Sequence, residues 1–217
     1  DWNVPINYYE RFPVATIQLP VVFTNDLADL SATARSNGNP GDHDEIRNAA
    51  DPNLAWRYAV RAYLATINFC DEAIGVMLDA VEARKAQFPG ERWMVVLWSD
   101  HGWHLGEKER WRKFTLWEES ARSVSMYWMP GTTTPGTRVE VPVSHMDIYP
   151  TVLELLGLER PRELQGRSLV PLMHNPALLN DNFPVMCDGE GWHTVRTRRW
   201  RYIRYSDGAE ELYDHSR

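Results

Sequence analysis

The sequence predicts an α/β fold, a layered sheet with flanking helices, because three kinds of segment follow one another along the chain. The first is an amphipathic helix over residues 54–88, in which apolar side chains recur at steps of three and four. The second is a pair of apolar runs, Trp93–Trp98 and Val124–Trp128, that are typical of strands. The third is a shorter helix from Asp147 to Gly157. Helices and strands in this order pack as layers around a sheet.

Capping and breaking residues mark the ends of these elements. Residues 1–53 are rich in Pro, Asn and Asp and lack a clear period, so they are expected to form an extended surface segment. Pro89-Gly90 is expected to end the long helix. Asp147 is expected to cap the shorter helix, Pro150 suits its first turn, and Gly157 ends it.

The pattern of the sequence changes after about residue 176. Short runs typical of strands follow at residues 185–188, 192–197, 200–205 and 211–213. Asp207-Gly208 indicates a turn between the last two of them. We therefore predict two domains: residues 1–175 form an incomplete α/β domain, and residues 176–217 begin a small antiparallel C-terminal subdomain.

The composition narrows the class of protein. The 217 residues include 43% hydrophobic residues and ten Trp, enough for a sizeable core. The formal net charge of -7 argues against nucleic acid as a general partner. No apolar run approaches the roughly 18 residues of a membrane span, so no membrane partner is expected. Cys70 and Cys187 do not form a disulfide framework, and both are expected to be buried free thiols.

The segment from Ser99 to Glu107 carries the strongest chemical pattern. Asp100 and His101 directly follow an apolar strand, where loops of an open α/β sheet gather around ligands. A carboxylate and an imidazole together suit a divalent cation. A zinc site built on Asp100, His101 and His104 is one alternative, although the chain lacks the HExxH motif and clustered cysteines that would support it.

Further motifs follow in a fixed order. Lys113 lies thirteen residues after Asp100, and the stretch Asp147–Gly157 and then Gly166–Leu172 come later. From about Val4 to its last residue, the chain resembles the C-terminal part of the sulfatase family in the alkaline-phosphatase superfamily. It is most similar to the branch of iduronate-sulfatase-like and choline-sulfatase-like enzymes. The resemblance implies an alkaline-phosphatase-like fold that is incomplete in this chain.

The resemblance also implies roles for four residues. Asp100 and His101 would bind a calcium ion, which orients the nucleophile and acts as a Lewis acid. Lys113 would contact the sulfate, and His104 would contact the substrate or its leaving group. The implied reaction is hydrolysis of a sulfate monoester to an alcohol and inorganic sulfate.

Other parts of the family pattern are unmatched. The family nucleophile is a formylglycine made from the first residue of Cys/Ser-x-Pro/Ala-x-Arg, and neither Cys70 nor Cys187 begins such a motif. Ser31–Arg35 is a near miss with Thr at the third place. The N-terminal aspartates that complete the calcium site are also unmatched. We therefore expect the chain to be inactive alone and to need an N-terminal sulfatase segment, joined to it or supplied as a separate chain.

Two alternatives remain open. A phosphonate monoester hydrolase or phosphodiesterase of the same superfamily would use the same cation and lysine groups, with Mg²⁺ or Mn²⁺ in place of Ca²⁺. A non-enzyme alternative is a nucleic-acid-binding module, because Arg196–Arg204 interleaves basic and aromatic residues. Strand alternation would place Arg199, Arg201 and Ile203 on one side of that stretch.

Overall fold

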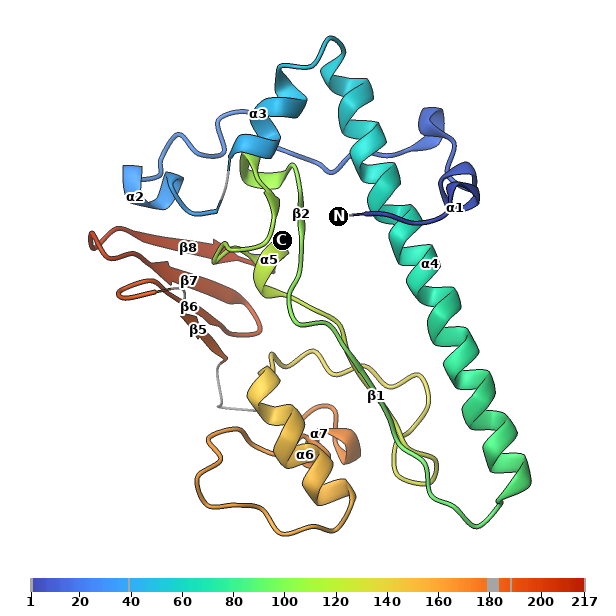
Figure 1. The fold of residues 1–217 in the computed structure, drawn as a ribbon. Coiled ribbons are helices and arrows are strands. Elements are labelled where there is room, and N and C mark those ends of the chain that lie inside the picture. Colours follow the sequence, from blue (N-terminus) through green and yellow to red (C-terminus); the bar gives the residue numbers. More distant parts are fainter. Residues whose placement is uncertain (1, 39, 179–183, 188, 217) are drawn as a thin grey trace. The chain divides into compact units, whose positions relative to one another are not determined.

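The computed structural model describes residues 2–38, 40–178, 184–187 and 189–216, whose helices and strands are drawn in Figure 1. These residues belong to two compact units. Unit 1 contains residues 1–29, 38–91 and 103–112, and unit 2 contains residues 30–37, 92–102 and 113–217. The chain passes back and forth between them, so each unit is built from separated stretches of sequence. The division into domains at residues 1–175 and 176–217 stays a prediction.

Unit 1 is organised around one long helix. Its elements are α1 (Ile6–Glu10), η1 (Val14–Thr16), α3 (Gly41–Arg47), α4 (Pro52–Gln87), β2 (His104–Leu105), η2 (Glu107–Glu109) and β3 (Trp111–Arg112). The Asp51 side chain accepts a hydrogen bond from the backbone of Leu54, and Pro52 occupies the first turn. The helix ends at Gln87, before Pro89-Gly90, so the prediction of a helix over residues 54–88 is confirmed.

The N-terminal half of α4 forms the core of unit 1. Val60 lies in an apolar cluster with Ile17 and Trp111. Trp56 donates a hydrogen bond from Nε1 to the carbonyl oxygen of Leu105, at 2.6 Å. The helix therefore fixes the β2–β3 hairpin, which carries His104.

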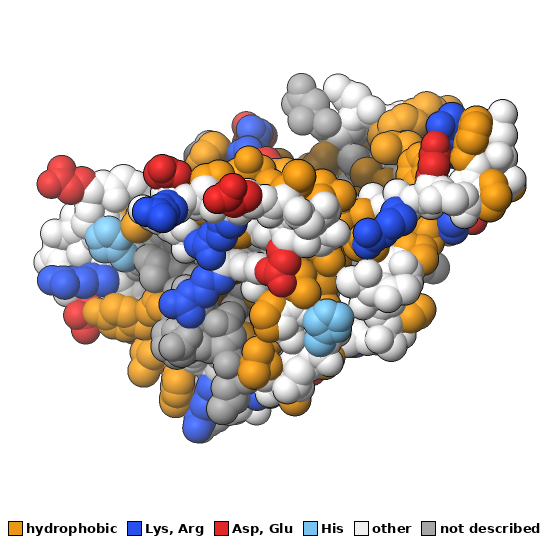
Figure 2. All heavy atoms as spheres, turned by 90° about the horizontal axis from the view of Figure 1, so that it is seen from below, with side chains coloured by type: hydrophobic (Ala, Val, Ile, Leu, Met, Phe, Trp, Pro, Cys, Tyr) orange, Lys and Arg blue, Asp and Glu red, His pale blue; other side chains and the backbone are white. Residues whose placement is uncertain are grey.

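The C-terminal half of α4 exposes apolar side chains. Val76 is 70% exposed and Met77 is 69% exposed. Figure 2 shows one face of the molecule, on which hydrophobic side chains lie exposed among charged ones. Cys70 is also exposed, as is Cys187 in unit 2, so the prediction of two buried thiols is wrong. The periodicity correctly gave one apolar stripe, but in the described residues much of that stripe faces solvent.

Unit 2 contains the remaining elements. They are α2 (Ala32–Arg35), β1 (Val95–Trp98), α5 (Glu118–Ala121), β4 (Ser125–Trp128), η3 (His145–Asp147), α6 (Ile148–Leu155), α7 (Val170–His174), β5 (Val185–Cys187), β6 (His193–Arg196), β7 (Trp200–Arg204) and β8 (Glu210–Asp214). Strands are therefore present at each of the four stretches expected after residue 176, although residue 188 of the first stretch lies outside the described residues.

The two apolar runs pair with each other rather than with a wider sheet. β1 and β4 are antiparallel, with Val95 opposite Trp128 and Trp98 opposite Ser125. The described residues form sheets of two, two and four strands, so the expected layered sheet is not assembled within them. An all-apolar strand such as β1 suits a sheet that is covered on both faces, yet here β1 has one strand neighbour.

The C-terminal sheet has the order β5-β6-β7-β8 and is antiparallel throughout. Arg201 and Ile203 on β7 are buried, whereas Trp200 and Arg204 are exposed. This alternation confirms the predicted side of Arg201 and Ile203, whereas Arg199, predicted on the same side, precedes β7 and is exposed. The turn at Asp207-Gly208 is confirmed by a positive φ of 84° at Gly208 and by the hydrogen bond from the Ala209 backbone to Asp207 Oδ1.

The start of α6 differs from the prediction. Asp147 occupies the predicted N-cap position of α6, but its side chain makes no capping hydrogen bond there. The capping box belongs to η3: the Ser144 hydroxyl accepts from the Met146 backbone, and the Asp147 carboxylate accepts from the Ser144 backbone. Asp147 is buried, and its second oxygen accepts from the backbone of Arg167 at 2.8 Å. The acidic residue therefore ties the helix start to a distant loop, a role that local sequence does not reveal.

Candidate functional site

The loop after β1 carries Asp100 and His101 and is held in place by its backbone. Ser99 donates its N–H to the carbonyl oxygen of Val124, and Gly102 donates to that of Ser120 at 2.8 Å. A Cβ atom at Gly102 would lie 2.0 Å from the Glu119 carbonyl oxygen. Only glycine fits there, so the sequence itself fixes how the loop approaches α5.

The two predicted metal ligands lie together in this loop. His101 Nε2 is 3.3 Å from Asp100 Oδ2, and His101 Nδ1 is 2.8 Å from the carbonyl oxygen of Gly102. Because a carbonyl can only accept, the Nδ1 atom must be the protonated one. In a neutral ring the Nε2 lone pair then faces a carboxylate oxygen. Two acceptors in this arrangement suit a cation placed between them.

The donor set is too small for a complete calcium site. Calcium takes about six to eight ligands, mostly oxygen. Over the described residues, no cluster of three or more His, Cys, Asp or Glu side chains is positioned to hold a metal ion. Asp100 and His101 therefore fit as part of a site and do not form one by themselves.

Lys113 belongs to unit 2, as do Asp100 and His101. It is partly buried, and its Nζ atom lies 5.2 Å from the centroid of the Phe114 ring. Phe114 has a positive φ of 69°, which turns the chain into three fully buried residues: Thr115, Leu116 and Trp117. The lysine therefore stands directly before a firmly anchored segment. That Lys113 shares a pocket with the Asp100 carboxylate and the His101 imidazole stays a prediction.

His104 lies in unit 1, on β2 opposite Arg112. Its side chain has no exposed surface. Burial lowers the pKa of His104 to about 4, and the charges of Arg110 and Lys108 act in the same direction. The ring is therefore neutral near pH 7. The predicted contact with substrate or leaving group stays a prediction, and it would have to be made by an uncharged imidazole.

The hairpin around His104 is braced by its own residues. Glu107 accepts a hydrogen bond from the backbone of Leu105 at 2.7 Å, and Lys108 pairs with Asp26 at 2.8 Å. Gly106 has a φ of 118°, and a Cβ atom there would lie 2.3 Å from the Trp56 ring. These contacts fix the backbone on which His104 sits.

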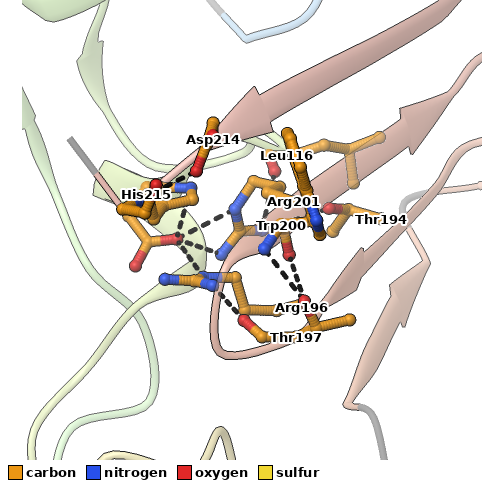
Figure 3. Close-up of polar contacts among 10 residues, drawn as sticks. Leu116, Thr194, Arg196, Thr197, Trp200, Arg201, Asp214 and His215 are labelled. Carbon is orange, nitrogen blue, oxygen red and sulfur yellow. Dashed lines mark hydrogen bonds and ion pairs between the residues drawn. The ribbon is translucent and has the colours of Figure 1, made fainter.

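A buried charge cluster in unit 2 was not predicted (Figure 3). Arg201 is 4% exposed and donates to the Glu118 carboxylate at 2.6 and 2.9 Å. Arg196 donates to the same carboxylate at 3.2 Å. Burial is the largest single influence on the Glu118 pKa and raises it, but the charge and hydrogen bonds of Arg201, together with the charge of Arg196, hold that pKa below its usual value. The strand alternation that placed Arg201 beside Ile203 was the available sign of an inward arginine.

Comparison with known proteins gives the class. The Sulfatase family profile matches residues 5–158, and the profile described as N-sulphoglucosamine sulphohydrolase, C-terminal, matches residues 106–217. The chain belongs to the sulfatase family.

Individual relatives agree with this class. A sulfatase from Formosa agariphila is 33% identical over 98% of this chain and 41% of its own length. A choline-sulfatase from Rhizobium meliloti is 31% identical over 73% of this chain and 31% of its own length. The chain thus spans about two fifths or less of the length of these curated relatives.

A solved structure agrees with the fold. The phosphonate monoester hydrolase from Silicibacter pomeroyi matches 97% of this chain and 46% of its own, with a TM-score of 0.79 and 21% identity. This likeness shows an alkaline-phosphatase-like fold and, at that identity, nothing about activity. None of the described helices combines the length and hydrophobicity needed to span a bilayer.

Proposed function

We propose that this chain is part of an enzyme that hydrolyses a sulfate monoester to an alcohol and inorganic sulfate. The observation that carries the proposal is the pairing of Asp100 and His101, two acceptors 3.3 Å apart at the end of β1, in a chain of the sulfatase family. Such a pair is suited to a cation that must sit beside an anionic substrate.

The metal site needs further ligands. We propose that Asp100 and His101 supply two ligands to a Ca²⁺ ion, which would act as a Lewis acid when bound. The other ligands and the formylglycine nucleophile would come from an N-terminal sulfatase segment, joined to this chain or separate from it. The small donor set of the described residues and the chain's share of its relatives' length support this division. On this proposal the chain has no sulfatase activity by itself.

The remaining two residues act on the substrate. Lys113 places an ammonium group beside the sulfate oxygens, where it offsets their negative charge. His104 is neutral at physiological pH, so it donates or accepts a hydrogen bond at the substrate or the leaving oxygen and does not act as a preformed imidazolium.

A fusion protein tests these roles. Residues 1–217 replace the matched segment of the Formosa agariphila sulfatase, and turnover of 4-nitrophenyl sulfate is measured. We expect Lys113→Ala to lower kcat/KM by about a hundred-fold or more, the scale of a lost transition-state contact. Lys85→Ala, near the end of α4 and outside the proposed site, is the matched control. Equal turnover by the Lys113 variant and the unmodified fusion would defeat the assigned role.

A second candidate is hydrolysis of phosphonate monoesters or phosphodiesters. Phosphonate and phosphate groups share the tetrahedral shape and anionic oxygens of a sulfate, so the proposed cation and lysine can hold them as well. The same fusion, assayed on a phenylphosphonate monoester with Mn²⁺ or Mg²⁺ and on 4-nitrophenyl sulfate with Ca²⁺, separates the two. A higher kcat/KM for the phosphonate would make it the primary activity.

The nucleic-acid alternative is disfavoured by the ion pairs of the basic stretch. Arg196 and Arg201 pair with Glu118, and Arg199 pairs with Asp214 at 2.7 Å. Arg199 is neutralised by its own carboxylate, Arg196 and Arg201 share the one charge of Glu118, and Arg201 is buried. A phosphate backbone binds to accessible positive charge, which this stretch offers only in part.

A further inference from the structure

The segment after Lys113 is anchored by the C-terminal sheet. Thr115, Leu116 and Trp117 are each at most 1% exposed. Trp117 donates from its ring nitrogen to Glu211 on β8 at 2.9 Å. The carbonyl oxygen of Leu116 accepts a hydrogen bond from Arg201 on β7. Two residues, Phe114 and Thr115, lie between Lys113 and this second contact, so the Lys113 backbone has little freedom.

Arg201 makes the central contact of this anchor (Figure 3). One terminal nitrogen donates to the carbonyl oxygen of Leu116 and to Thr194 Oγ1, both at 3.1 Å. The other terminal nitrogen and Nε donate to Glu118. The planar guanidinium reaches the two ends of the Leu116–Glu118 turn at once, which a single ammonium group cannot do.

The charged groups around Arg201 determine which of its contacts another residue could replace. The Glu118 carboxylate forms ion pairs with both Arg201 and Arg196, the latter at 3.2 Å from Arg196 Nε. His215 Nε2 lies 3.8 Å from the same carboxylate oxygen. Arg201 and Leu116 are both buried, so water is poorly placed to replace the contact between them. If Arg201 were removed, Arg196 could still pair with Glu118, but the buried Leu116 carbonyl would lose the donor that Arg201 supplies.

We propose that Arg201 is a positioning residue for Lys113. It fixes the Leu116–Glu118 turn against the C-terminal sheet and thereby sets the direction in which the lysine ammonium points. The proposal rests on the proposed function only for its catalytic consequence, namely that Lys113 contacts the sulfate. The positioning itself concerns this chain alone.

The positioning is tested on the chain by NMR of its lysines. Lys85, Lys108 and Lys113 are the three lysines of the sequence, so reductive methylation with ¹³C-formaldehyde gives three lysine signals besides that of the N-terminal amine. Lys113 Nζ lies near the Phe114 ring, and the ring current makes its signal sensitive to orientation. In Arg201→Met we expect the Lys113 signal to move toward the position of a free lysine and to narrow. The other two signals should not change.

The control removes the same group from a neighbouring position. Arg199 lies beside β7, pairs with Asp214 and is 57% exposed, so Arg199→Met changes the charge equally and leaves the Lys113 segment alone. If Arg201→Met does not fold, Arg201→Lys keeps the charge but loses the simultaneous contacts, and it should produce a smaller change in the same direction. An unchanged Lys113 signal in a folded Arg201 variant, or an equal change in Arg199→Met, would overturn the proposal.

The catalytic consequence is tested in the fusion by a double-mutant cycle. We expect Arg201→Met to lower kcat/KM by about a hundred-fold through displacement of the lysine, with partial rescue in Arg201→Lys. In a Lys113→Ala background the Arg201 change should have little further effect, whereas a merely structural role would give additive losses. Additive losses overturn the proposal. A Lys113→Ala fusion with full activity defeats the proposed function instead, and the NMR result then decides on Arg201.

Discussion

Replacing Gly102 with alanine should displace the loop that carries Asp100 and His101. The added Cβ would lie 2.0 Å from the carbonyl oxygen of Glu119 and 2.3 Å from that of Arg122, whereas ordinary contact begins at 3.4 Å. Both neighbours are backbone atoms, so no side-chain rotation relieves the overlap. The loop must move by an ångström or more, and the hydrogen bond from Gly102 to Ser120 is lost.

The magnitude follows from these two effects. Overpacking costs about 1–3 kcal/mol, and a lost backbone hydrogen bond adds about 1 kcal/mol. A destabilisation of about 3 kcal/mol corresponds to a fall in Tm of roughly 6–12 °C for a protein of this size. Differential scanning fluorimetry measures it, with Gly75→Ala as the control, because Gly75 lies within α4 and a Cβ there meets no atom within 4 Å.

The control should move in the opposite direction. Alanine in a helix interior is favoured over glycine by about 1 kcal/mol, so Gly75→Ala should raise the Tm slightly or leave it unchanged. A Gly102→Ala protein whose Tm stays within about 2 °C of the unmodified chain would show that the loop does not approach α5 as described.

Two further outcomes are expected. Because the folded His104 has a pKa of about 4 against an ordinary value of 6.5, the unfolded chain takes up a proton that the folded chain excludes. Stability is therefore full above pH 6.5 and falls by about 3 kcal/mol toward pH 4, and His104→Gln should remove that part of the slope in urea unfolding measured at several pH values. Ser144→Ala should cost about 1 kcal/mol by removing the capping box before α6, and an unchanged urea midpoint would show that the cap is dispensable.

Local patterns predicted the elements well. The apolar steps and the flanking Asp51 and Pro89-Gly90 located α4, because periodicity and end signals depend on nearby residues. The alternation along β7 correctly separated Arg201 from Trp200. The burial of Cys70 was predicted wrongly. A stripe of apolar residues shows which side of a helix is hydrophobic, but it does not show which element, if any, packs on that side.

The residue types of the candidate site could be predicted from the sequence, but the contacts that hold those residues in place could not. Asp100 and His101 follow a strand end, which a sequence shows directly. The contacts of Arg201 join residues that are more than 80 positions apart, so no local pattern could reveal them. Asp147 illustrates the same limit: an acidic residue at a helix start suggests a cap, whereas its carboxylate also holds the backbone of Arg167.

Three features of the described residues support an active site that is completed by another segment. The strand β1 has an all-apolar sequence but one strand neighbour, the second half of α4 exposes residues such as Val76 and Met77, and the Asp100–His101 pair is short of ligands for calcium. Exposed apolar surface, as on β1 and α4, is unfavourable in water. A pair of only two ligands binds a metal ion weakly. All three features are explained together if further strands pack on these surfaces and further carboxylates complete the metal site. The proposal that another segment supplies them agrees with the chain's 41% share of the length of the Formosa agariphila relative.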